Sequence, residues 1–151
     1  MANYLSVSTK SVEQGQGRLP KLRGQIAPTK VVIADATLYD YESGSVILLG
    51  ANGIDVTLPA AAAGLNFTFI LTANYDTAVC TIIQAAATED FWGHHFDATT
   101  GGSGDSGAAS NTKITFTSTS LKGDRVELIS DGTVWYVKAS GRADSSITFD
   151  N

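Results

Sequence analysis

The sequence predicts a single all-β domain, an antiparallel sandwich or barrel that follows an extended N-terminal arm. Short apolar runs, several of them alternating with polar residues, recur along most of the chain between turn residues, which is typical of strands. Helical periodicity is almost absent. The length of 151 residues fits one domain, and 43% hydrophobic with 17% charged residues is enough for one folded core.

The first 30 residues differ from the rest in charge and pattern. They contain five basic residues and one acid, a net charge of +4, whereas residues 31–151 contain five basic residues and fourteen acids, a net charge of −9. Two interpretations stand: a terminus without fixed structure, or an arm that becomes ordered on a partner. In the second case the contact residues are Arg18, Leu19, Lys21, Leu22, Arg23 and Ile26.

Residues 31–151 are expected to form the β-domain. Its strands are expected at 31–34, 45–50, 54–58, 65–73, 78–84 and 112–118. Successive strand residues point to opposite sides, so Ile54, Val56 and Leu58 should share one face. For the same reason Ile114 and Phe116 should point into the core.

The clearest element is a C-terminal hairpin within residues 123–141. Val126 and Leu128 alternate with charged residues, and Asp131-Gly132 predicts a tight type I′ turn before the returning strand. On that strand Trp135 and Tyr136 point to opposite sides. We expect Trp135 to lie in the core and Tyr136 on the outer face of the sheet.

Two further segments are expected to be irregular or short. Pro59, four alanines and Gly64 form the one helix candidate, of one turn at most. Residues 97–112 contain four glycines among small polar residues, which predicts a long loop.

Three local patterns suggest chemistry, and each has a simpler structural interpretation. Residues 104–107 spell the GDSG that surrounds the nucleophile of trypsin-like proteases, but no matching histidine and aspartate accompany it. His94 and His95 are adjacent, so on a strand they point to opposite faces and cannot chelate one metal. Glu89 and Asp90 beside Phe91-Trp92 resemble a sugar site without its second matched carboxylate. We therefore expect no enzyme, no metal and no cofactor.

Composition also restricts partners and location. An acidic body lacks the basic surface that nucleic acid requires, and no run of about 18 apolar residues could span a membrane. The single cysteine, Cys80, cannot form an internal disulfide, and the N-terminus has no secretory signal. Synthesis and assembly in a reducing cytoplasm are therefore expected.

Two stretches, VTLPAAAAGLNFTFILTA at 56–73 and ITFTSTSLKGDRVELISDGTVWYVKASG at 114–141, carry a resemblance. Their order is a strand ending in Leu-Pro, an aromatic-rich strand, Gly-Asp, an apolar strand, a Ser-Asp-Gly turn and a Trp-bearing strand. This order resembles capsid decoration (cement) proteins of tailed bacteriophages and related β-rich fibre or tip domains. The resemblance covers about the last hundred residues and implies a jelly-roll-like or β-tulip-like module.

The resemblance implies a homotrimer on the outer surface of a phage head, where it stabilises the shell by binding the major capsid protein. The N-terminal arm would then lie on the shell or reach a neighbouring trimer. The alternative is a receptor- or glycan-binding tip of a tail fibre, although no β-helical repeat or coiled-coil heptad is present.

Overall fold

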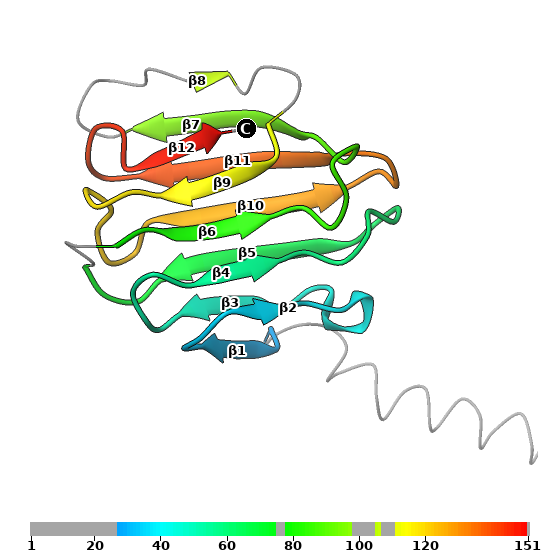
Figure 1. Cartoon of the computed structure of the whole chain (residues 1–151), viewed down its shortest axis with the longest axis horizontal. Coiled ribbons are helices and arrows are strands. Elements are labelled where there is room, and N and C mark those ends of the chain that lie inside the picture. The colour runs from blue at the N-terminus through cyan, green and yellow to red at the C-terminus, as the bar shows by residue number, and fades with distance from the viewer. Residues whose placement is uncertain (1–26, 75–77, 98–104, 107–110, 151) are drawn as a thin grey trace, which may run out of the picture.

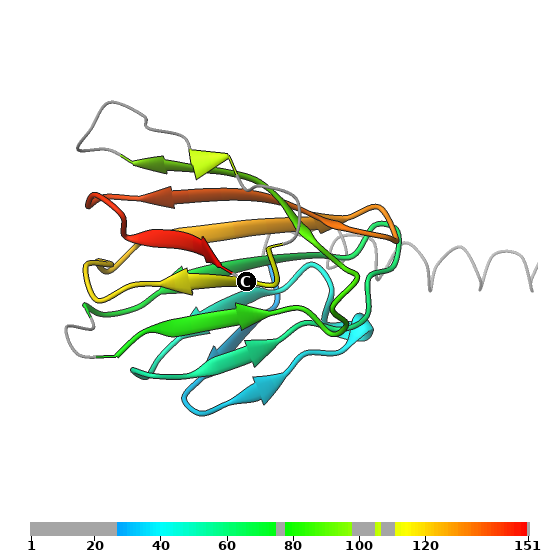
Figure 2. The same cartoon turned by 45° about the horizontal axis from the view of Figure 1, so that its top comes forward.

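The computed structural model describes residues 27–74, 78–97, 105–106 and 111–150. Two β-sheets pack face to face as a sandwich (Figures 1 and 2), which confirms the all-β prediction. Sheet A contains, in order, β1 (Thr29–Val32), β3 (Val46–Leu49), β5 (Asn66–Leu71), β10 (Arg125–Ser130), β11 (Trp135–Gly141), β7 (Phe91–Asp97) and the two-residue β8 (Asp105–Ser106). Sheet B contains β12 (Ile147–Asp150), β9 (Lys113–Phe116), β6 (Cys80–Ile83), β4 (Asp55–Thr57) and β2 (Ala36–Thr37).

Both sheets are mixed, so the prediction of an antiparallel sandwich is wrong in strand direction. From β1 to β6 the chain enters the two sheets in turn, with odd strands in sheet A and even strands in sheet B. The chain therefore returns to the same sheet after a full turn and in the same direction. As a result β1, β3 and β5 are parallel, as are β2, β4 and β6. The opposite sheet supplies the crossover that parallel strands need.

The second half of the chain contributes the antiparallel pairs. β10 pairs with β11 over six residue pairs and with β5 on its other side, which confirms the predicted hairpin. The tight type I′ turn is wrong, because Ser130 pairs with Trp135 and leaves a loop of four residues. Only Gly132 in that loop has a positive φ, of 106°. The Asp131 carboxylate instead accepts the backbone N–H groups of Thr133 and Val134.

The core lies between the sheets, and the alternation of residues predicted it well. Ile54, Val56 and Leu58 are buried, as are Ile114 and Phe116. Trp135 is fully buried beside Phe67, with ring centroids 6.0 Å apart, whereas Tyr136 is exposed on the outer side. The remaining large buried side chains include Ile47, Leu49, Phe69, Leu71, Ile82 and Phe91.

All six predicted strands and the hairpin are present, but five other elements were not predicted. These are β2, β7, β8, β12 and the 3-10 helix η1 (Asp40–Glu42). β7 has the sequence FWGHHFD, in which Gly93 and two histidines obscure the alternation. Gly93 is required there, because a Cβ at this position would overlap the backbone of Val137 on β11.

Three expectations about the irregular segments can be compared with the structure. Residues 59–64 contain no helix, because Pro59 and the alanines continue from β4 as an extended segment that ends in a turn. The loop at 97–112 contains β8 and a single bridge from Asn111 to Phe91, and residues 98–104 and 107–110 lie outside the described residues. β1 begins at Thr29, so the predicted arm of residues 1–30 overlaps this strand.

Candidate functional site

The outer side of sheet A carries most of the exposed large hydrophobic side chains that the structure describes. We call it the apolar face. Ile129, Tyr136 and Trp92 are direct neighbours across β10, β11 and β7, and they are 53%, 49% and 43% exposed. Phe96 lies further along β7, and at the other edge of the sheet Val31 and Ile33 are 60% and 71% exposed. These six side chains leave roughly 600 Å² of apolar surface in water, at the upper end of the largest patch on a typical monomer.

Half-exposed aliphatic residues extend the β1 end of this face. Val31 on β1 pairs with Leu48 on β3, which pairs with Ile70 on β5. Both Leu48 and Ile70 are only partly buried. Gly50 keeps this end flat, since a Cβ there would meet the side chains of Val31 and Ile33. These residues form an aliphatic strip from β1 to β5, and Arg125, the next residue in the row, separates the strip from the aromatic end of the face.

A charged row crosses the middle of the apolar face. Glu127 is 3.2 Å from an Arg125 nitrogen and 3.9 Å from Lys138 Nζ, so one carboxylate faces two cations. The row therefore carries a surplus of one positive charge. Among the other side chains that the structure describes, ten are acidic and four are basic. The apolar face is thus a weakly positive surface on an acidic body.

The outer side of sheet B has a different composition, and we call it the threonine face. Thr81, Thr115 and Thr148 form a continuous row across β6, β9 and β12, with Asp55 of β4 at its end. Thr81 and Thr115 are each only 9% exposed. Small side chains in cross-strand contact thus cover the centre of this sheet, beside the partly buried Ile83.

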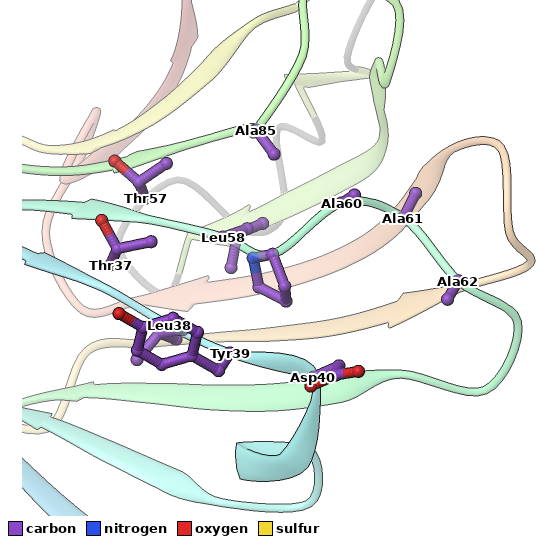
Figure 3. Close-up of a pocket in the computed structure, with 11 residues that line it drawn as sticks. Thr37, Leu38, Tyr39, Asp40, Thr57, Leu58, Ala60, Ala61, Ala62 and Ala85 are labelled. Atoms are coloured by element: carbon purple, nitrogen blue, oxygen red, sulfur yellow. The ribbon is translucent and has the colours of Figure 1, made fainter.

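A groove with a volume of about 540 Å³ opens beside the edge of sheet B (Figure 3). Small apolar residues form one wall, and Asp40 and Tyr39 stand on the opposite side. Tyr39 stacks on Tyr41 with ring centroids 5.4 Å apart, and both rings are exposed. The lining comprises Thr37, Leu38, Tyr39, Asp40, Thr57, Leu58, Pro59, Ala60, Ala61, Ala62 and Ala85.

Hydrogen bonds hold both walls of the groove. Glu42 accepts from Lys30 Nζ at 2.6 Å and from the Tyr39 N–H at 2.9 Å, which ties η1 to β1. Burial raises the pKa of Glu42, but these hydrogen bonds and the Lys30 charge outweigh it and the pKa is lowered. The opposite wall is fixed by the Ala61 N–H, which donates to Glu89 Oε1 at 3.0 Å.

The β10–β11 loop supports the aromatic end of the apolar face. Asp131 accepts from two backbone N–H groups and from the hydroxyls of Thr133 and Tyr136. The backbone N–H groups of Val134 and Thr133 are the main reason that the pKa of Asp131 lies far below its ordinary value. The same contact raises the pKa of Tyr136, because an anionic neighbour opposes loss of its proton.

The two histidines point to opposite sides, as predicted. His94 lies on the apolar face beside Lys138, whereas His95 is 3% exposed and its Nε2 has no hydrogen-bond partner. The strand register places Ser106 of the GDSG sequence opposite His94. A catalytic triad would need a carboxylate on the other side of that histidine, where Lys138 stands instead.

The other candidate positions are separated by the fold. Glu89 is turned toward the groove wall, while Trp92 lies on the apolar face, so they do not form one sugar site. Cys80 is buried, and burial raises the pKa of its thiol.

In the described parts of the chain no cluster of three potential metal ligands occurs, and no helix is long and apolar enough to cross a membrane. The six arm residues from Arg18 to Ile26 lie outside the described residues.

Sequence reasoning missed both the apolar face and the groove. A signal for the face was present, because the runs VVIA and SVILLG are continuously apolar instead of alternating. A continuous run predicts a strand that is apolar on both sides. The groove had no comparable signal, since it depends on η1 and on the extended path of residues 59–62.

Comparisons with protein-family models, curated proteins and solved structures each found no match.

Proposed function

We propose that this protein is a structural component of a phage virion, a decoration protein that binds the outer surface of the head as a homotrimer and stabilises the shell. The observation that carries the proposal is the apolar face, which leaves six large hydrophobic side chains in water. A surface of this size is typical of protein–protein contact. The resemblance of residues 56–73 and 114–141 to decoration proteins supplies the class of assembly.

In this proposal the N-terminal arm makes the contact with the shell. The arm enters the fold at β1, so its attachment point lies at the edge of sheet A. Leu19, Leu22 and Ile26 would bury apolar surface on the major capsid protein, while Arg18, Lys21 and Arg23 would pair with acids. Three arms per trimer would act together, so weak single contacts would give stable attachment.

The acidic body agrees with a role that involves no nucleic acid, membrane, cofactor or catalysis. We place the protein on the virion surface after assembly in the host cytoplasm. Its single buried cysteine needs no oxidising compartment.

The number of copies per virion tests the proposed class. Quantitative mass spectrometry of purified virions should give a copy number comparable with that of the major capsid protein. A handful of copies per virion would contradict a decoration protein and indicate a tail or fibre component.

Removal of residues 1–26 tests the role of the arm and leaves β1 complete. The truncated protein should keep the far-ultraviolet circular dichroism of the full chain but fail to co-sediment with phage heads that lack it. A matched full-length control carries Lys10→Ala, since this basic residue is not among the proposed contacts. Co-sedimentation of the truncated protein at the full-length level would refute the proposal for the arm.

One observation favours the alternative, a glycan-binding tip of a tail fibre. Trp92 and Tyr136 are adjacent and exposed on β7 and β11, and such aromatic pairs can stack on sugar rings. This alternative predicts binding of the isolated protein on a glycan array, with loss of binding in Trp92→Ala. If the protein is instead a decoration protein, the wild type should bind the glycan array no more strongly than Trp92→Ala does.

A further inference from the structure

We infer that copies of this chain associate head to tail, with the apolar face of one copy seated on the groove of the next. The inference specifies the contacts behind the self-association in the proposed function and rests on that part of it. The two surfaces occupy different parts of one copy, sheet A and the edge of sheet B beside η1. One copy can therefore use both surfaces at the same time.

Shape is the first argument. Ile129, Tyr136 and Trp92 form a row of bulky, about half-exposed side chains on the apolar face, with a hollow beside Ile129 and Tyr136. The groove offers a concave counterpart of about 540 Å³ with a wall of Leu58, Pro59 and alanines, and alanine side chains leave room for larger ones (Figure 3). Tyr39 and Tyr41 on the other wall add exposed aromatic surface. Buried aromatic and aliphatic side chains at such a centre supply most of the binding energy of an interface.

Charge is the second argument. Arg125 and Lys138 leave a surplus positive charge beside the row of Ile129, Tyr136 and Trp92. Asp40 lines the groove, and Asp35 and Asp55 lie at the adjoining edge of sheet B. The nearest cation, Lys30, is already paired with Glu42. Positive face and acidic groove therefore attract, whereas two apolar faces back to back would bring two surplus positive charges together.

Area is the third argument. The six exposed hydrophobic side chains of the apolar face account for roughly 600 Å², and a stable interface buries about 800 Å² on each partner. Contacts made by the charged row and by Leu48 and Ile70 can supply the remainder. A head-to-tail contact closes into a ring when the rotation between copies allows it, and a trimer is one such ring.

A mixing experiment separates this arrangement from all face-to-face ones. The face variant is Ile129→Glu, which places a carboxylate against the acidic groove. The groove variant is Ala60→Tyr, which fills the groove with a neutral ring. Ile129 and Ala60 are both exposed in a single copy, so both variants should keep the wild-type circular dichroism. Ile129→Ser and Ala62→Tyr serve as second variants if either of the first fails to fold.

Sedimentation velocity of the full chain at about 100 μM measures the outcome. The wild type should be oligomeric, and each variant alone should be monomeric or weakened at least about tenfold in association. A mixture of the two should form a 1:1 complex, because the groove of one and the face of the other are intact. Ser118→Tyr, an exposed change away from both surfaces, should behave like the wild type.

Three results would overturn the inference: a monomeric wild type, a variant with wild-type association, or a mixture that stays monomeric. None of them depends on phage heads. If the sedimentation experiment overturns the head-to-tail contact but the copy number per virion is high, the proposed decoration function still stands. If the contact is found but only a handful of copies occur per virion, the decoration function is refuted and the contact remains.

Discussion

The two outer faces of the sandwich are built on similar backbones but leave very different surfaces in water. On sheet A the outward positions include tryptophan, tyrosine, phenylalanine, isoleucine and valine beside the charged row, and several of these apolar residues are about half exposed. On sheet B they hold mainly threonine, and the central Thr81 and Thr115 are 9% exposed. A threonine row leaves little apolar surface in water, because Thr81 and Thr115 are small and largely buried and the Thr148 hydroxyl donates to Asp150. The apolar face is stabilised only when a partner removes it from water.

This difference indicates which side of the sandwich binds a partner. Both faces have the same core behind them, so folding does not explain why one is apolar. The sandwich would be equally well packed with threonine on both faces. The apolar face therefore indicates a binding surface, and the threonine face indicates a surface left to solvent.

The largest effect is expected from a substitution that disrupts sheet A, which carries the apolar face. In Gly93→Ala the new Cβ would overlap the Val137 backbone, so β7 and β11 would have to separate. We expect a loss of about 3 kcal/mol in the free energy of unfolding, measured by urea denaturation. Ser140→Ala, on the outer side of β11, should change this free energy by less than about 0.5 kcal/mol. An unchanged urea midpoint for Gly93→Ala would contradict the register between β7 and β11.

The next prediction compares the two faces by the same substitution. Trp92→Lys should weaken self-association by about 2 kcal/mol, since central aromatic residues dominate such interfaces. Thr148→Lys on the threonine face should leave the association constant unchanged. Sedimentation equilibrium measures both variants. Equal losses from the two variants would show that the faces do not differ in function.

A smaller effect concerns the loop that supports Tyr136. Asp131→Asn should lower the melting temperature at pH 7, because a neutral side chain is a weaker acceptor for the N–H groups of Thr133 and Val134. Because the pKa of Asp131 is lower in the folded state, its ionised carboxylate stabilises the fold at pH values above the ordinary carboxyl pKa of about 4. This stabilisation is lost as the pH falls from there through the lowered, folded-state pKa.

Melting temperatures from pH 7 down to pH 2 test this assignment. The gap between the wild type and Asp131→Asn should be largest near neutral pH and should narrow below about pH 4. Thr119→Ala provides a control in a loop that is remote from Asp131. A gap that stays constant over the whole range would contradict the role given to the Asp131 carboxylate.

The smallest predicted effect is at the groove. Glu42→Gln keeps a hydrogen-bond acceptor for the Tyr39 N–H but loses the charge that faces Lys30. Because Lys30 is 36% exposed, we expect a loss of no more than about 0.5 kcal/mol in the free energy of unfolding. Binding of a second copy should also be slightly weaker, since η1 carries one wall of the groove. A loss above about 2 kcal/mol would mean that η1 supports the core as well.

The sequence predicted local structure better than topology. Alternation located Val56, Ile114 and Phe116 in the core, because burial on one side of a strand depends only on neighbouring residues. Strand direction depends on which sheet the chain enters next, and no local pattern records that choice. The parallel winding of β1 to β6 was therefore missed, and short strands such as β2 gave no pattern at all.

The same limit applies to the candidate site. Trp92 and Tyr136 are 44 residues apart in the chain, and only the parallel pairing of β7 with β11 makes them neighbours. The prediction of a tight turn at Asp131-Gly132 was wrong because hydrogen bonds donated to the Asp131 carboxylate stabilise a longer loop. Both features depend on contacts that a single sequence does not display.

Fluorescence quenching of the two tryptophans tests the central claim most directly. Trp135 is fully buried and Trp92 is 43% exposed, so Trp92 reports on the apolar face. Acrylamide quenching of the full chain should be strong at concentrations where it is monomeric and should fall to the level of Trp92→Phe as copies associate. Association that leaves the quenching of Trp92 unchanged would show that the apolar face remains in water, and would contradict the account.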